Sequence, residues 1–497
     1  MAASKTGRFT TGSTMRHVAV MTVTGSLGLS FMFLVDFATL FYVSLLGDEA
    51  LTAGVGFAWA LQFFNVSVGI GVAIAALALV SRAIGAREPA RARSHATSAM
   101  LFAVILLLAV AGVMVTIRHE VLALIGAQGE AATVAARFLL ISVPSLPFVG
   151  VGMVASSILR AEGDAKRAML VTMTSGATAM VLAPLLIFGF DLGVDGAAID
   201  MVLSRAVSSS VGLWFCVGKS LCAQPSLRDA KKFVGPFFAI AGPATATQLS
   251  TPLGNILLTW WIADFGDSAP GGWGGASGLT VLAFGGIFAL SGAIGGIIGQ
   301  NYGARLAPRV ASAYRDSLIF ASGYVIATWA LLAAFAPLIV RGFGVSEAGA
   351  SVVYAFCYIG AGGFMFNGAL FVANAAFNNL GRPLWSTGFN WFRDAAVTPL
   401  ALTLIPVTAG PSGVVYAQAF AGVIVGSAAV AVGWRLSHRI RFKPEEGAEW
   451  TAGAMAPTSA RGAAALLHAT ERAAPAPESA SGARPRHGLD SDAETNN

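Results

Sequence analysis

A nine-residue motif occurs twice in this chain, and the two copies lie 218 residues apart. Leu79–Arg87 reads LVSRAIGAR and Ile297–Arg305 reads IIGQNYGAR. Each copy follows an apolar run and precedes a basic stretch. Three glycines recur at nearly the same offset: Gly25, Gly163 and Gly196 return as Gly242, Gly381 and Gly413. A repeat of this length predicts two similar halves, an arrangement typical of transporters whose site lies between two lobes.

The chain is too apolar to cover itself with a water-facing surface. Hydrophobic residues make up 56% of it and charged residues 11%, against roughly 25% charged in soluble domains. Twelve apolar segments approach or exceed the roughly 20 residues that span a bilayer, six in each half. Six is an even number, so both halves insert in the same orientation, as parallel repeats. The sequence therefore predicts an all-α integral membrane protein with twelve transmembrane helices in two six-helix bundles.

Basic residues concentrate in alternate loops, and basic loops stay in the cytoplasm. We therefore expect a multi-pass protein of the cell (inner) membrane with both termini cytoplasmic. The same pattern explains the net charge of +6 without a nucleic-acid partner. The predicted parts are a cytoplasmic N-terminal segment at 1–17, a first lobe at 18–218, a cytoplasmic linker at 219–232, a second lobe at 233–440 and a disordered cytoplasmic tail at 441–497.

Several motifs resemble the multidrug and toxic compound extrusion (MATE) family of secondary transporters. They are the two copies of the repeat, Gly242-Pro243, the stretch Leu182–Pro184 followed by Gly193–Ala198, and Arg393. The resemblance implies two bundles forming a V around a central cavity, and export of organic compounds driven by H⁺ or Na⁺. On this basis we expect a monomer in the lipid bilayer with a small organic substrate. We expect no cofactor, and three cysteines without a CxxC pair indicate no metal site.

The sequence also departs from the family at the residues that couple transport to an ion. Asp36 matches the aspartate that members with a first-lobe cation site keep in span one. The span-five Asn and Asp of one branch are here Ala179 and Ala183, and the span-seven Glu of others is Thr251. The span-ten Asp falls near Ala369. A Na⁺ site needs several clustered oxygen ligands, so these losses favour H⁺ as the coupling ion, with Na⁺ the less favoured alternative.

Two aspartates are the candidates for proton or cation coupling. A carboxylate inside a span costs on the order of 2.5–3.5 kcal/mol, so it is rare and usually functional. Asp36 lies among apolar residues of span one, and burial favours the protonated form of a carboxyl group. Asp200 in span six either replaces the carboxylate missing at Ala183 or serves as a wetted helix-end residue, with Arg205 as a possible partner. Asp36 has no carboxylate at the repeat-equivalent position, near Leu253 or Gly254, which predicts that coupling resides in the first lobe.

Three further charged residues are predicted to be structural, and eight residues are candidates to line the substrate cavity. We expect Arg205, Arg393 and Asp394 to lock helices together, the alternative being an anionic-substrate path. Adjacent residues on a helix diverge by about 100°, so Asp394 is not expected to pair with Arg393. The cavity candidates are amides and aromatics suited to a flat cationic substrate: Gln62, Asn65, Gln248, Asn255, Tyr354, Asn367, Asn374 and Trp391.

The sequence thus predicts a proton-coupled exporter of organic, cationic and amphipathic compounds that works by alternating access. A lipid-linked saccharide flippase of the wider superfamily is an alternative, but that class has a more cationic cavity than Arg205 and Arg393 provide. A membrane-embedded enzyme is disfavoured because the spans hold no HExxH motif and no Gly-x-Ser-x-Gly elbow with a mid-span histidine. A receptor is disfavoured by the duplication of the lobes.

Overall fold

The computed structural model describes residues 7–266, 269–405 and 409–442, and the described part contains helices and no strands. The first six predicted spans correspond to the following elements, which we call the first lobe: α1 (Thr14–Ser44), α2 (Glu49–Gly85), α3 (Pro89–Thr116) with α4 (Arg118–Leu124), α5 (Gly129–Ser142) joined to α6 (Leu146–Glu162), α7 (Ala165–Pro184) continued by the π-helix η3 (Leu185–Gly189), and α8 (Gly193–Gly218). A short 3₁₀ turn, η1 (Arg8–Thr10), precedes α1.

The remaining helices, which we call the second lobe, follow the same order. They are α9 (Leu227–Ala263), α10 (Ala269–Ala283) with α11 (Gly285–Gly303), α12 (Ala307–Phe343), α13 (Glu347–Ala355) with the π-helix η4 (Phe356–Gly360) and α14 (Ala361–Asn379), α15 (Pro383–Phe392) with the π-helix η5 (Arg393–Val397) and α16 (Thr398–Leu404), and α18 (Ser412–His438). All of these helices belong to one compact unit, Met1–Ile440, and a second unit begins at Arg441. The predicted tail lies outside the described residues from 443 onward.

The described residues provide twelve membrane-length segments, which agrees with the predicted twelve spans. Nine are single apolar helical segments, and α10 with α11 forms a tenth that bends by 45°. The other two are α9 and the α15–α16 segment. Prolines and amides make α9 less apolar, with Pro236, Pro243 and Pro252 inside it, and the α15–α16 segment is divided by a π-helical turn.

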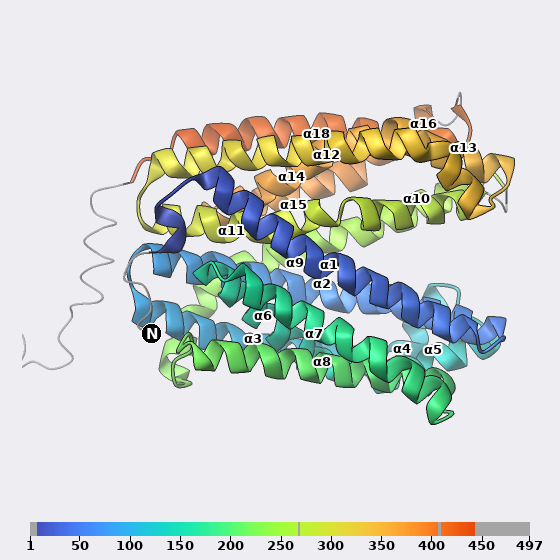
Figure 1. Ribbon diagram of the computed structural model, residues 1–497, viewed down its shortest axis with the longest axis horizontal. Helices are drawn as coiled ribbons and strands as arrows, with labels where there is room; N and C mark the ends of the chain where they lie inside the picture. The colour runs from blue at the N-terminus through green and yellow to red at the C-terminus, as the bar shows by residue number, and fades with distance from the viewer. Residues whose placement is uncertain (1–6, 267–268, 406–408, 443–497) are drawn as a thin grey trace, which may run out of the picture. The chain divides into compact units, whose positions relative to one another are not determined.

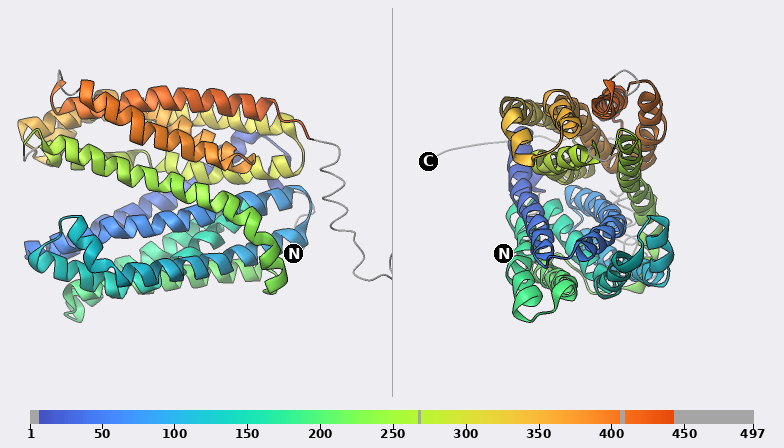
Figure 2. Two further views of the ribbon diagram at one scale, coloured as in Figure 1. Left: turned by 180° about the vertical axis from the view of Figure 1, so that it is seen from behind. Right: turned by 90° about the vertical axis from the view of Figure 1, so that its right-hand side faces the viewer.

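Each lobe sends one helix across to the other (Figure 1). Helix α1 packs on α7 of its own lobe and also on α11 of the second lobe. Helix α9 does the reverse, because it packs on α15 of its own lobe and on α2 of the first. In the end-on view of Figure 2, α1 runs in dark blue from one group of helices to the other. The crossing follows the repeat, since α1 and α9 are the first helices of their lobes.

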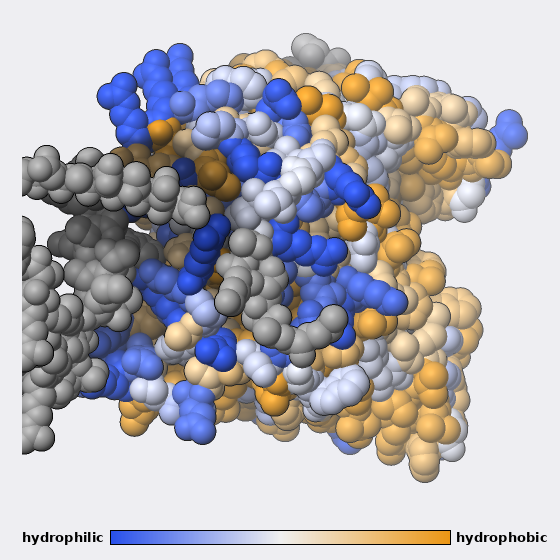
Figure 3. All heavy atoms as spheres, turned by 60° about the vertical axis from the view of Figure 1, so that its left-hand side comes forward, coloured by the Kyte–Doolittle hydropathy of each residue, from blue (hydrophilic) through white to orange (hydrophobic). Residues whose placement is uncertain are grey.

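The two ends of the helical unit differ in character. We call the end that holds the chain's N-terminal turn and the C-terminal ends of α2 and α11 the motif end. Hydrophilic side chains gather over this end, whereas the sides are covered by apolar residues (Figure 3). Farther from the motif end, the surface in Figure 3 is hollowed between two apolar masses. This distribution is what a membrane-spanning protein requires, because lipid must meet apolar side chains.

Candidate functional site

The repeated motif forms the contact between the lobes, which we call the motif seam. Repeat-equivalent residues of α2 and α11 meet there, and the glycines leave no room for a side chain. If Gly295 carried a Cβ atom, it would lie 2.6 Å from Cδ2 of Leu77, and a Cβ atom on Gly299 would collide with the Ser81 hydroxyl. Gly295 and Gly299 are four residues apart, so they lie on one face of α11. Small residues at this spacing let membrane helices approach closely. The glycines of the motif therefore bring the two lobes together.

The last turn of the seam is reciprocal. A Cβ on Gly85 would collide with the backbone carbonyl of Gln300, and a Cβ on Gly303 would collide with that of Arg82. Gly85 and Gly303 are equivalent in the repeat, and so are Arg82 and Gln300. The two copies thus pack against each other around a local pseudo-twofold axis, as identical surfaces do in a symmetric dimer. Arg82 adds hydrogen bonds of 3.0 and 2.9 Å to the carbonyls of Asn379 and Asn378 in the second lobe.

The N-terminal turn closes over the same end and touches both lobes. Phe9 is only 1% exposed, and its backbone N–H donates to the Gln300 side chain at 2.8 Å. The Gln300 amide in turn donates to the carbonyl of Ala161 at 2.6 Å. Arg8 donates to the carbonyl of Gly163 at 2.8 Å. Gln300 lies in the second lobe and the two acceptor carbonyls in the first, so this turn bridges the lobes beside the seam.

The first lobe contains a buried polar cluster around Arg205 of α8. Its guanidinium donates to the Ser142 carbonyl at 3.2 Å, to the Ser145 hydroxyl at 2.9 Å and to the Gln62 carbonyl oxygen at 3.3 Å. Gln62 also donates to the Ser142 hydroxyl at 2.7 Å. All three acceptors are neutral. Within the described residues, no carboxylate lies within 4 Å of Arg205, so this partly buried cation has no direct ion pair.

The two candidate coupling aspartates lie in different surroundings near this cluster. Asp36 is exposed, in the half of α1 farther from the motif end. It makes no ion pair with Arg205, although the two opposite charges attract each other. Asp200 is 2% exposed and accepts a hydrogen bond from the Ser204 hydroxyl at 3.1 Å. Arg205 therefore attracts Asp36 at a distance, and Asp200 bonds to Ser204 rather than to Arg205.

The second lobe has its own buried charges, and they form a direct pair. Arg393 donates to both carboxylate oxygens of Asp394, from Nε at 2.7 Å and from Nη2 at 3.0 Å, and each side chain is 13% exposed. The expectation that these neighbours do not pair is wrong. An arginine side chain is long enough to reach the carboxylate of the next residue on a helix, as Arg315 also does with Asp316 in α12. Arg393 also donates to Asn367 of α14 at 3.1 Å.

The comparisons with known proteins identify the family. The MatE family model matches twice, over residues 26–185 and over residues 243–403, which together make up more than half of the chain. The chain belongs to the MATE family of transporters. It is a membrane transporter and not an enzyme, and the two matches coincide with the two copies of the repeat.

Individual relatives of this MATE protein carry different names. A protein of Shewanella oneidensis named FAD transporter is 24% identical over 417 residues, which cover 81% of this chain and 91% of that protein. A multidrug export protein MepA of Staphylococcus saprophyticus is 25% identical over 265 residues, 52% of this chain and 58% of that protein. The relatives therefore place the chain in a family of small-molecule transporters, and their names differ in the substrate.

Solved transporter structures share the fold of this MATE protein. A MOP superfamily transporter from Pyrococcus furiosus aligns with a TM-score of 0.82 and 22% identity over 88% of this chain and 99% of that one. A multidrug resistance MATE family transporter in an outward-facing conformation aligns with a TM-score of 0.81 at the same identity and coverage. At this identity the similarity is one of fold.

The predicted cavity residues of this MATE protein fall into two groups. Four are bonded within a lobe: Gln62 and Asn367 in the clusters above, Asn374, which accepts from Asn390 at 3.1 Å, and Trp391, which donates to the Ala246 carbonyl at 2.9 Å. The other four make no side-chain hydrogen bond within the described part of the chain: Asn65, Gln248, Asn255 and Tyr354, the last of which stacks on Tyr358 with the ring centroids 5.9 Å apart. Asn65 is 2% exposed and its Nδ2 has no partner among the described residues.

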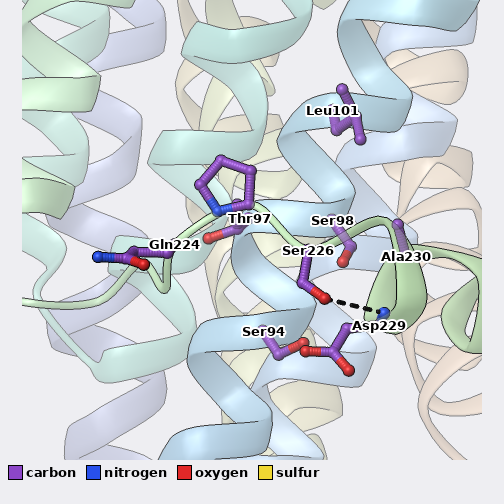
Figure 4. A pocket seen from close by; sticks show the side chains of 9 residues that line it. Ser94, Thr97, Ser98, Leu101, Gln224, Ser226, Asp229 and Ala230 are labelled. Carbon is purple, nitrogen blue, oxygen red and sulfur yellow. Dashed lines mark hydrogen bonds between the residues drawn. The ribbon is translucent and has the colours of Figure 1, made fainter.

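Two surface hollows differ in what they can hold. Asn255, Ile256, Thr259, Trp260 and Ala263, all on one face of α9, line a wide-open hollow of about 440 Å³. The hollow in Figure 4, where residues 224–230 meet α3, measures about 10 Å³. That is room for a single water, and its Ser226 caps α9 by accepting from the Asp229 N–H at 3.3 Å.

Proposed function

We propose that this MATE protein exports small organic compounds in exchange for protons by alternating access. The observation that carries the proposal is the arrangement of Asp36 and Arg205 in the first lobe. An exposed carboxylate attracts a partly buried guanidinium that has no direct carboxylate partner among residues 7–266, 269–405 and 409–442. A proton that binds Asp36 removes the negative charge that Arg205 attracts. The packing of the first lobe then responds to the protonation state of one residue.

The fixed positive charge of Arg205 supports H⁺ rather than Na⁺ as the coupling ion. Arginine stays protonated in proteins, so a sodium ion at Asp36 would have to lie near a second cation. Protonation instead neutralises Asp36 and adds no cation beside the guanidinium. Asp200, the other carboxylate of the lobe, already accepts from Ser204, and we propose that it supports the cluster as a second titrating group.

We further propose that the motif end faces the cytoplasm and that both termini are cytoplasmic. The basic loops lie at this end, as the positive-inside rule requires. With the seam packed and Asp36 exposed in the far half of α1, this conformation corresponds to the outward-facing state. The fold similarity to a transporter solved in an outward-facing conformation agrees with this interpretation. Opening of the seam would then produce the inward-facing state, in a protein that acts as a monomer in the inner membrane.

We propose cationic, amphipathic compounds as the substrate class, because Asp36 is an exposed carboxylate within a membrane span and Trp260 lines the α9 pocket. A second candidate is a planar anionic compound such as a flavin nucleotide. The relative named FAD transporter favours it. A lipid-linked saccharide flippase has less support, since Arg205 and Arg393 are both held by protein acceptors.

Transport by purified protein in proteoliposomes tests the proposal. We expect Asp36→Asn to reduce uptake of an organic cation driven by a pH gradient by about tenfold or more, because the asparagine cannot exchange a proton. Asp48→Asn is the matched control, since Asp48 only caps α2 at the Ala50 N–H. Unchanged pH-driven transport in Asp36→Asn would refute proton coupling at this residue. Transport that follows a Na⁺ gradient instead would refute the choice of ion.

A further inference from the structure

One arginine at the contact between the lobes has no partner in the protein. Arg160 lies two residues before α6 ends at Glu162, and its Nη1 is 3.1 Å from the position that a Cβ atom on Gly292 of α11 would take. Its guanidinium therefore lies against a helix of the other lobe. Within residues 7–266, 269–405 and 409–442, this side chain makes no hydrogen bond and no ion pair. An arginine held between transmembrane helices needs an acceptor.

The charges around Arg160 do not neutralise it. Helix α11, against which the guanidinium lies, has no charged residue. Glu162 of the same helix interacts instead with Lys219 and Asp164, and the N-terminal turn adds another cation, Arg8. Arg160 is partly exposed, so an anion from outside the chain can reach a positive charge that the described part of the protein leaves uncompensated.

The repeat indicates that the fold does not require a charge at this position. Asn378 lies 218 residues after Arg160; it is 3% exposed and accepts a hydrogen bond from Ser386 of its own lobe at 3.2 Å. The next residue of each copy keeps its role, since both backbone carbonyls accept a hydrogen bond from the opposite lobe. Gly292, which leaves room for the guanidinium, has Ile74 as its repeat equivalent. The helix end is thus held in the same way in both lobes, and the charge and its space are additions of the first.

A second unsatisfied polar group lies at the same level between the lobes. A Cβ atom on Gly25 of α1 would lie 3.3 Å from Cβ of Ala289 of α11. One helical turn closer to the motif end, on the same faces, these helices carry Thr22 and Gly292. Thr22 is 1% exposed, and its hydroxyl has no hydrogen-bond partner in the described part of the chain. The guanidinium of Arg160 and a free hydroxyl are therefore both near Gly292.

We propose that Arg160 binds a phosphate or carboxylate group of a small organic compound that enters when the motif seam opens. The planar guanidinium can donate two parallel hydrogen bonds to either anion. Once α1 and α11 separate, the Thr22 hydroxyl can donate a further one. The site lies beside the seam, because a Cβ atom on Gly296 would lie 2.9 Å from the Arg160 carbonyl oxygen. The inference rests on the proposed function and names an anionic group as one feature of the transported compound.

Flavin mononucleotide and riboflavin are matched probes, because they share the flavin ring and differ by one phosphate group. Their affinities for the full chain in phosphatidylcholine nanodiscs are measured by flavin fluorescence. We expect the wild type to bind flavin mononucleotide roughly tenfold or more tighter than riboflavin. Arg160→Gln should lose this preference by weakening the nucleotide alone, and Arg160→Lys should keep part of it. Arg93→Gln is the matched control, since it removes one exposed positive charge at the same end of the protein.

The melting temperature separates a binding role of Arg160 from a structural one. The side chain has no partner to lose within the described residues, so Arg160→Gln without ligand should melt at the wild-type temperature or above it. Flavin mononucleotide should raise the melting temperature of the wild type and not that of Arg160→Gln. The proposal is overturned if the wild type binds both probes equally or if Arg160→Gln keeps the preference. An equal loss of preference in Arg93→Gln would also overturn it, because the whole charged end would then attract the anion.

Two further measurements identify the source of the anion and separate the site from the proposed function. If phosphatidylglycerol in the nanodiscs weakens nucleotide binding by the wild type and not by Arg160→Gln, the site holds a lipid phosphate and the assignment to a transported compound is overturned. Unchanged binding supports that assignment. If pH-driven transport of an organic cation occurs without a preference for the nucleotide, only the Arg160 site is refuted. If the preference is present without pH-driven transport, the proposed function is refuted and Arg160 remains an anion site.

Discussion

Substitution of Gly303 by alanine places a methyl group at the point where the two copies of the motif cross. The new Cβ would lie well inside the 3.0 Å that real Cβ atoms keep from other atoms, and the atom it meets is the backbone carbonyl oxygen of Arg82. A carbonyl in a helix cannot rotate away, so α2 and α11 must separate. Overpacking of this kind costs about 1–3 kcal/mol, which corresponds to a roughly 5- to 150-fold shift in a two-state equilibrium.

The shift should favour the conformation in which the motif end is open. We would measure it as a distance distribution between spin labels at two exposed positions of that end, Ala90 in the first lobe and Arg435 in the second. We expect Gly303→Ala to add or enlarge a population at longer distance. Gly85→Ala should do the same, because its Cβ meets the Gln300 carbonyl in the reciprocal contact.

Gly323→Ala in α12 provides the matched control, since its Cβ would meet nothing within 4 Å. There the alanine brings only its better helix propensity, which is worth up to about 1 kcal/mol, so the distance distribution should stay as in the wild type. The reasoning would be refuted if Gly303→Ala left the distribution unchanged. It would also be refuted if Gly323→Ala shifted it equally, because the effect would then not depend on the seam.

Two further variants test the motif end by thermal unfolding in detergent. Phe9→Ala should lower the melting temperature, because truncating a fully buried phenylalanine costs up to about 3–5 kcal/mol. The control Phe37→Ala changes a side chain that is 69% exposed, so it should alter the melting temperature little. Equal effects of the two variants would contradict the bridging role of the N-terminal turn. Asp164→Ala should also destabilise the protein, by about 1 kcal/mol for the lost cap of α7 and more for the ion pairs with Arg167 and Lys219. Burial alone would raise the pKa of Asp164, but hydrogen bonds from Lys219 and Arg167 outweigh burial and hold the pKa below its usual value. The stabilisation that the ionised Asp164 provides is therefore present above about pH 4, and it is lost as the pH falls through the folded-state pKa. A difference between wild type and Asp164→Ala that persisted undiminished well below pH 3 would contradict that assignment.

The number and order of the spans could be predicted from the sequence because length and apolar composition decide whether a helix crosses a membrane. The repeat also predicted two equivalent lobes. It could not predict that equivalent residues such as Ser81 and Gly299 touch, because a sequence period fixes which residues correspond and not where the symmetry axis passes. Similarly, nothing in the short apolar stretch around Phe9 distinguishes a bridging turn from a solvated end.

The charged residues show a different limit. Asp36 was identifiable because a carboxylate inside a span is rare. The hydrogen-bond acceptors of Arg205 were not identifiable from the sequence, because Ser142 and Ser145 resemble any other serines in a membrane helix. Whether they face Arg205 depends on the rotation of α5 against α8. The Arg393–Asp394 pair was predicted wrongly because the argument considered only the directions in which adjacent side chains leave the helix. It left out the length of the arginine side chain, which also lets Arg315 reach Asp316 in the α-helix α12.

The central claim is that the repeated motif holds the lobes together at one end and must separate in every transport cycle. Cysteines at Arg82 and Tyr302 test it most directly, because these side chains meet across the seam, with the guanidinium carbon 5.6 Å from the ring centroid, and neither substitution adds bulk at a seam glycine. We predict that a bifunctional thiol reagent links Arg82→Cys to Tyr302→Cys through disulfides and stops transport in proteoliposomes, and that reduction restores transport. Each single variant should be unaffected by the reagent. Continued transport by the fully cross-linked protein would contradict the account.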